Sequence, residues 1–248
     1  MRKGSFWGLL YCEWALMKKH LLIISVSGLC MAAMAFLAVL SFRFGNLADL
    51  IDEDTKKLIL GDLAVAAKAF PALCCYFALS APIDGAANET KTVWVHFRRS
   101  TPANGFRLAL AKFTVMTALT VFSAAAAIGA TALSCAILGT DLAVSDIAIA
   151  LAMLAVFVVL CVIMYVCLIL FKSRDKGGLA ACGVFAVCLL SVVIPAIDNM
   201  PAGMTGLERF NFFVEKATDF LPFIPIVIVA ALLLGLFATT MIYKRREK

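Results

Sequence analysis

The residues of this 248-residue chain that could do chemistry are few, and their spacing does not match a catalytic site. The sequence lacks a phosphate-binding GxxxxGK[ST] loop, the HExxH pattern of metalloproteases and the GxSxG pattern of hydrolases. Its two histidines, His20 and His96, and its nine cysteines, which form no CxxC pair, do not have the spacing of a metal site. We therefore expect a protein that is not an enzyme and has no metal or cofactor of its own.

Charged side chains inside apolar segments are the next candidates, because an ionisable group at bilayer depth is costly and usually functional. No Asp or Glu falls inside the long apolar segments, which removes the carboxylate that ion-coupled carriers commonly use. Lys112 lies about one turn inside its segment, from where its ammonium group can snorkel to the cytoplasmic surface. Lys68 lies deeper, where it either snorkels outward or contacts a substrate or a neighbouring helix.

The composition places these residues in a membrane protein. Apolar residues make up 63% of the chain and charged residues 15%, with a mean hydropathy of +0.99, whereas a soluble domain is roughly half apolar and a quarter charged. A helix needs about 20 apolar residues to cross a bilayer. The long apolar runs therefore predict six spans: Leu21–Phe42, Leu63–Pro82, Leu108–Leu138, Ile147–Phe171, Gly177–Ile197 and Phe220–Tyr243. We expect one all-α domain over residues 1–248, which excludes a soluble enzyme and a β-barrel.

The distribution of charge predicts the topology of these spans. Sixteen of the 22 Lys and Arg residues lie at the two ends of the chain or around the connections that follow the second and fourth spans. Eleven of the 16 acidic residues lie on the other side. Because cytoplasmic loops carry the excess of Lys and Arg, both termini are expected in the cytoplasm. The net charge of +6 then reports topology rather than binding to nucleic acid.

The segment Ser5–Lys19 predicts a helix that lies on the membrane surface before the first span. Its residues Trp7, Tyr11 and Trp14 fall on one helical face, and Glu13 falls away from that face. Aromatic side chains are enriched at the level of the lipid headgroups, and a helix with one aromatic face lies in the plane of that layer. We expect an interfacial helix here.

The connection between the second and third spans contains the segment Asn88–Asn104. It mixes aromatic with charged residues and has no helix breaker before Pro102. Asn104 can then cap the helix that becomes the third span. Two interpretations stay open, a short amphipathic helix that protrudes from the membrane, and a solvated basic loop that only follows the charge rule.

The outer connection between the fifth and sixth spans contains a second amphipathic stretch, residues 207–217. One face of the predicted helix is apolar and consists of Leu207, Phe210, Phe213, Val214 and Ala217. Charged and amide side chains occupy the other face, so we expect a second interfacial helix, on the outer surface. It either covers an exit path or shields the helix bundle.

Two stretches carry a resemblance to a known family. The stretch from Glu89 to Phe113 begins with an acidic residue, contains a proline and ends in Leu-Ala-Lys-Phe, and the N-terminal Leu-Leu-Tyr-Cys-Glu at 9–13 is similar to an "LLxK[DE]" opening. With these features the chain resembles, over essentially its whole length, the permease subunits of ABC-2-type transporters. The small six-span bacterial members in peptide and antibiotic exporters are the most similar. The sequence departs from the family pattern at Cys12, Thr101 and Gly105.

The resemblance implies partners and a site. In this family the first cytoplasmic loop forms a coupling helix that docks in a separate cytosolic ATP-binding-cassette ATPase, and two permease subunits, identical or sister, enclose the route. Carried onto this chain, the ATPase contact would consist of Glu89, Lys91, Trp94, Phe97, Arg98, Arg99 and Pro102. Trp94 and Phe97 would be its apolar anchors. ATP would be bound by the partner subunit, and the chain would lie in the bacterial inner membrane and export a peptide or another hydrophobic or amphipathic molecule.

Two other functions remain as alternatives to an exporter subunit. One is a stand-alone secondary carrier or channel, against which the missing intramembrane carboxylates and the six-span size argue. The other is a membrane protein that transports nothing, such as an immunity factor or an assembly scaffold.

Overall fold

The structure, a computed structural model, describes four continuous stretches of the chain, residues 6–15, 104–138, 141–198 and 218–247. It also describes the isolated positions 18, 22, 26, 33, 37, 40, 79, 82, 83, 212, 215 and 216. The predicted spans 21–42 and 63–82, the segment 88–104 and the outer helix 207–217 lie outside the described residues, except at some of these positions and at Asn104. The predicted site residues that lie outside are Lys68, Glu89, Lys91, Trp94, Phe97, Arg98, Arg99 and Pro102.

The continuous stretches consist almost entirely of helix. After the helix at 6–15 come α5 (Gly105–Leu138), α6 (Val144–Phe171), α7 (Arg174–Asp198), the 3-10 turn η3 (Leu221–Phe223) and α9 (Ile224–Glu247). The described residues contain no strand. Within the described stretches, three helices are long and apolar enough to cross a membrane, over Gly105–Leu133, Val144–Phe171 and Leu221–Arg245. For the described residues, the prediction of an all-α, multi-pass membrane protein is confirmed. The six spans and the cytoplasmic termini stay predictions.

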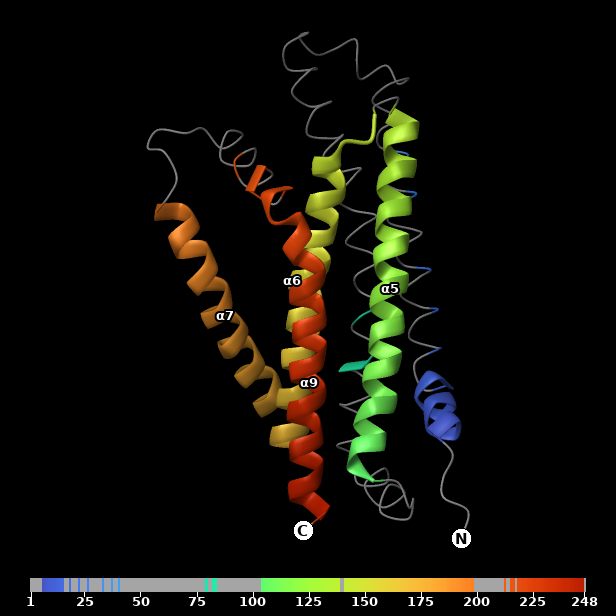
Figure 1. The fold of residues 1–248 in the computed structure, drawn as a ribbon, viewed down its shortest axis with the longest axis vertical. Helices are drawn as coiled ribbons and strands as arrows, with labels where there is room; N and C mark the ends of the chain where they lie inside the picture. Colours follow the sequence, from blue (N-terminus) through green and yellow to red (C-terminus); the bar gives the residue numbers. More distant parts are fainter. Residues whose placement is uncertain are drawn as a thin grey trace.

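The long helices alternate in direction between the two ends of the bundle (Figure 1). α5 and α7 begin at the end where the helix at 6–15 lies, and α6 and α9 finish at that same end. We call it the terminal end. α6 is central, because it packs against α5, α7 and α9. The gap between α7 and α9 widens toward the opposite end of the bundle (Figure 1).

α5 begins at Gly105 rather than at the predicted Leu108, because a polar residue outside the apolar run caps the helix. The Asn104 side-chain oxygen accepts a hydrogen bond from the Phe106 N–H at 3.4 Å. The Asn104 carbonyl accepts another from the Leu108 N–H at 3.2 Å. These bonds confirm the prediction that Asn104 caps this helix. α5 therefore follows directly on the segment 88–104.

A tight turn joins α6 to α7. Lys172 adopts a left-handed conformation with φ of 53°, and its N–H donates to the Leu168 carbonyl at 3.1 Å, which ends α6. α7 then begins at Arg174, before the predicted Gly177. Gly177 passes so close to α6 that an added Cβ would lie 2.9 Å from the Leu168 Cα. Glycine at 177 thus allows the two helices to leave the turn in contact.

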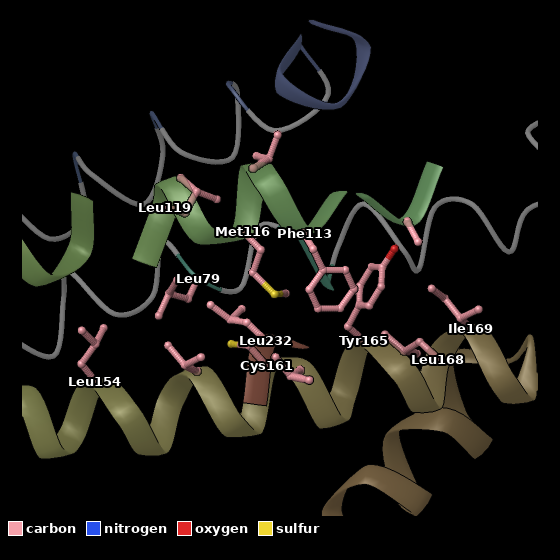
Figure 2. Close-up of a cluster of buried hydrophobic side chains, with 14 of the residues drawn as sticks. Leu79, Phe113, Met116, Leu119, Leu154, Cys161, Tyr165, Leu168, Ile169 and Leu232 are labelled. Atoms are coloured by element: carbon pink, nitrogen blue, oxygen red, sulfur yellow. The ribbon is translucent and has the colours of Figure 1, made fainter. Parts of the chain in front are cut away.

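The hydrophobic core lies where α5, α6 and α9 meet. Figure 2 shows the rings of Phe113 from α5 and Tyr165 from α6 next to each other between the two helices. Their centroids are 5.7 Å apart and their planes make an angle of 87°, an edge-to-face pair. Gly235 brings α9 against them, because an added Cβ would lie 2.5 Å from Val162 Cγ1 and 2.8 Å from Phe113 Cε1. We call Phe113, Val162, Tyr165 and Gly235 the three-helix junction.

Candidate functional site

The helix at 6–15 has two faces of opposite character. Trp7, Tyr11 and Trp14 are 74%, 73% and 47% exposed. Glu13 is buried, and it lies about 200° around the helix from Tyr11. The predicted separation of the aromatic residues from Glu13 is therefore confirmed. The structure adds the direction of each face: the carboxylate points into the protein and the aromatic residues point away from it.

The carboxylate of Glu13 forms an ion pair with Lys112 of α5. The Lys112 Nζ lies 3.1 Å from Glu13 Oε2 and also 3.1 Å from Oε1. Only 4% of the lysine side chain and 9% of the glutamate side chain are exposed. The two residues are 99 positions apart in the sequence. The pair thus fastens the N-terminal helix to the first turns of α5, at the terminal end of the bundle.

Lys112, which by its place in the sequence can snorkel to the membrane surface, is buried in the structure, and its ammonium group reaches Glu13. Taking an ammonium and a carboxylate out of water costs several kcal/mol per ion, which is offset only when the two charges meet in good geometry. The close approach to both carboxylate oxygens provides that geometry. Each of these two side chains is therefore buried as part of a pair.

The ion pair borders the three-helix junction directly. Phe113, the residue after Lys112, contributes its ring to the junction and packs on Tyr165. A cavity of about 10 Å³ lies between the two features and is lined by Pro82, Lys112, Phe113, Met116 and Tyr165. This volume is close to the minimum that one water molecule needs. The ion pair therefore joins the helix at 6–15 to α5 next to the point where α5 packs against α6.

Hydroxyl groups along α5 are bonded to their own helix. Thr114, Thr117, Thr120 and Thr131 donate to the carbonyl oxygens of Leu110, Phe113, Met116 and Ala127 at 2.7 to 2.9 Å. Back-bonding of this kind satisfies a hydroxyl donor in an apolar environment. The hydrogen-bonding needs of these threonine hydroxyl donors are therefore met within α5, whose exposed large apolar side chains include Phe106, Val121, Phe122 and Leu133.

Of the predicted site residues, Trp7, Tyr11, Glu13 and Trp14 lie within the described part of the chain, all on the helix at 6–15. Sequence reasoning placed Glu13 on the polar face of that helix and Lys112 at the edge of a span, but it did not pair them. The sequence did contain a signal for this pair. Glu13 is an acid that faces away from an aromatic stripe, and Lys112 is a base one turn inside an apolar segment. Each of the two stretches that carry the family resemblance supplies one of the two residues.

The described residues define the chain as a helical, multi-pass membrane protein with a buried ion pair at the terminal end of its bundle. In comparisons with protein-family models, with curated proteins and with solved structures, no match to this chain was found.

Proposed function

We propose that this chain is the permease subunit of an ATP-driven exporter of the ABC-2 type, in which it forms the translocation route and is moved by a separate cytosolic ATPase. The observation that carries the proposal is the Glu13–Lys112 pair at the start of α5. It joins a surface helix, a membrane-spanning helix and the point where the segment 88–104 enters that helix. A connection of this kind is what a subunit needs if a partner drives it from outside the membrane.

The force would enter through the segment 88–104. Trp94 and Phe97 would be apolar anchors in the ATPase, surrounded by Glu89, Lys91, Arg98 and Arg99, with Pro102 ending the segment. Asn104 caps α5 immediately afterwards, so a displacement of the segment is passed to a helix with a firm first turn. Coupling then requires that the ATP-bound partner favour one conformation of the permease over another.

The three-helix junction would spread that displacement through the bundle. Phe113 packs against α6 and α9 only one residue beyond the ion pair, so a tilt of α5 cannot leave the other two helices in place. Interiors packed as tightly as this transmit strain rather than absorb it. α7 packs on α6 and would follow its movement.

The nature of the cargo follows from what the spans offer. α5, α6 and α9 present apolar side chains outward, and the threonines described above are bonded within α5. A route between such surfaces suits a hydrophobic or amphipathic molecule, such as a peptide. The proposal includes six spans, both termini in the cytoplasm, a second permease subunit of the same or a related sequence, and the bacterial inner membrane as location. Lys68 would be an intramembrane contact for the cargo.

The experiment that tests this function is affinity purification of the tagged full chain from its native membrane, with mass-spectrometric identification of what accompanies it. We expect an ATP-binding-cassette ATPase in near-stoichiometric amount. The variant Trp94→Ala/Phe97→Ala should insert normally and lose the ATPase. The matched control is Phe122→Ala/Phe237→Ala, which removes two exposed aromatic rings from α5 and α9 and should keep the ATPase. Absence of any ATPase from the wild-type preparation would refute the proposal.

A further inference from the structure

We propose that Glu13 is a positioning residue, which through Lys112 makes the helix at 6–15 and α5 one rigid unit anchored at the level of the lipid headgroups. This unit holds the start of α5 at a fixed depth, so that a push on the segment 88–104 tilts α5 instead of sliding it through the membrane. The purpose assigned to the unit rests on the proposed function. The rigid unit itself lies within this one chain and requires no partner protein.

The rigidity follows from the burial of the two charges. If the helix at 6–15 moved away from α5, the buried Lys112 ammonium would lose the Glu13 carboxylate that lies 3.1 Å from it. A buried charge that loses its partner is strongly unfavourable. The contact of one Nζ with both carboxylate oxygens also limits rotation of the N-terminal helix about its own axis. The pair therefore fixes both the position and the rotation of this helix.

The ion pair holds the helix at 6–15 in the rotation about its own axis that turns its aromatic residues away from the protein. Trp7 and Tyr11 lie one helical turn apart and are the most exposed aromatic residues of the N-terminal helix. Phe6 packs edge-to-face on Trp7, with centroids 6.4 Å apart, which holds the indole ring in place. The ring systems of Trp and Tyr are amphipathic and prefer the boundary between hydrocarbon and water. The surface they contact in this proposal is the headgroup layer of the surrounding bilayer.

The position of the junction makes the anchor effective. The terminal end of α5 carries the ion pair, and Phe113 locks α5 against Val162 and Gly235 immediately beyond it. The part of α5 that lies before Lys112 is short, and the part that lies beyond Phe113 is long. With its start held at constant depth, α5 can respond to a lateral push only by tilting about this region.

The test is a distance measurement between the N-terminal helix and α5 in the full chain, reconstituted in lipid nanodiscs without an ATPase. Nitroxide labels are attached to ketone-bearing amino acids at Gly8 and Leu133, both exposed, so that the native cysteines remain. Leu133 lies about 30 Å along α5 from Lys112. Distances of this size can be measured by pulsed electron–electron double resonance. A second pair of labels at Leu133 and Met241 joins α5 to α9 and serves as the control distance.

We expect a narrow Gly8–Leu133 distance distribution in the wild type and one at least twice as broad in Glu13→Gln and in Lys112→Met. The exchanged variant Glu13→Lys/Lys112→Glu should restore much of the narrow distribution, because it re-forms the pair in the opposite sense. The Leu133–Met241 distribution should stay unchanged throughout. Asp219→Asn, which breaks the exposed ion pair with Lys216, is the matched control for loss of a carboxylate and should change neither distance.

A Gly8–Leu133 distribution that stays equally narrow in Glu13→Gln would overturn the inference. If the control distance broadens in the single variants, the bundle has been disrupted, and the exchanged variant then decides: recovery of both distances supports the pair, and no recovery rejects it. The result is independent of the proposed function. Loss of the ATPase from the purified wild type would refute that function and leave the rigid unit standing, whereas an unchanged distance would reject the unit alone.

Discussion

The Lys112 Nζ lies 3.1 Å from each carboxylate oxygen of Glu13, so a helix near the N-terminus neutralises a buried charge of α5. The next residue of α5, Phe113, packs edge-to-face on Tyr165 of α6. The residue that anchors α5 to the N-terminal helix is therefore the direct neighbour of the residue that packs α5 against α6. The predictions below follow from this arrangement and from the two close helix contacts made by glycine.

Removal of one partner of the ion pair should destabilise the protein strongly. Glu13→Gln and Lys112→Met each remove one charge of the buried pair and deprive the other of it, and each should lower the free energy of unfolding by roughly 3–5 kcal/mol. The doubly neutral Glu13→Gln/Lys112→Met should lose far less than the two single changes together, because no charge is left without a partner. Unfolding of the purified chain by a denaturing detergent in mixed micelles measures these differences.

The control for this cycle is the exposed pair between Lys216 and Asp219, whose Nζ and Oδ2 are 3.3 Å apart. An exposed pair contributes about 0–1 kcal/mol, so Asp219→Asn should leave stability nearly unchanged. Additive losses in the Glu13 and Lys112 cycle would show that the two side chains do not interact energetically.

Gly235→Ala should separate α9 from the three-helix junction. The new methyl group would meet Val162 Cγ1 at 2.5 Å and the Phe113 ring at 2.8 Å, so side chains in a packed core must shift. Overpacking of this kind costs typically about 1–3 kcal/mol. The control is Gly183→Ala in α7, where an added Cβ meets no atom within 4 Å. There the better helix propensity of alanine should leave stability equal or slightly raised, and thermal unfolding in detergent compares the two variants. Equal melting temperatures would contradict the close packing of α9.

Gly177→Ala should disturb the turn between α6 and α7. Its Cβ would lie 2.9 Å from the Leu168 Cα, a backbone atom that cannot rotate away, so α7 itself must move. The next residue provides a matched control, since a Cβ on Gly178 meets no atom within 4 Å. We expect Gly177→Ala to lower the melting temperature and Gly178→Ala to leave it unchanged or raise it. A larger effect at 178 than at 177 would show that the helices approach each other differently.

The outward aromatic face predicts the depth of Trp7 in the bilayer. With Trp14 and Trp94 replaced by Phe, the emission of Trp7 reports its surroundings in lipid vesicles. Quenchers placed near the headgroups should reduce this emission more than quenchers at the acyl-chain ends, because Trp prefers the interface. Glu13→Gln should widen the range of depths. Stronger quenching by the deep probes would place the helix inside the hydrocarbon layer and contradict the interfacial assignment.

The helices α5, α6, α7 and α9 could be predicted from the sequence because an apolar run makes up most of each. Among the described residues, α5, α6 and α9 are the ones long and apolar enough to cross a bilayer. The predicted starts are a few residues late at α5 and α7, because Asn104, Gly105 and the charged residues from Arg174 extend these helices beyond their apolar parts. Helix ends depend on capping groups and hydrogen bonds, and hydropathy does not report these.

The candidate site could be predicted only in part. The periodicity of the helix at 6–15 separates the aromatic residues from Glu13, but it does not tell which face meets the protein. The partner of Glu13 is 99 residues away, and a lysine near the edge of a span is expected to reach water in the absence of a neighbouring acid. The close helix contact at Gly235 could not be predicted either, because it depends on where α6 and α9 cross.

The most direct test of the central claim is a comparison of inside-out vesicles that contain the purified chain alone with vesicles that contain it together with its co-purified ATPase. Mixtures of amphipathic peptides are added outside with ATP, and peptides retained inside are identified by mass spectrometry. The account predicts accumulation only when the ATPase and hydrolysable ATP are both present. Accumulation of a solute against its gradient by the chain alone would contradict it.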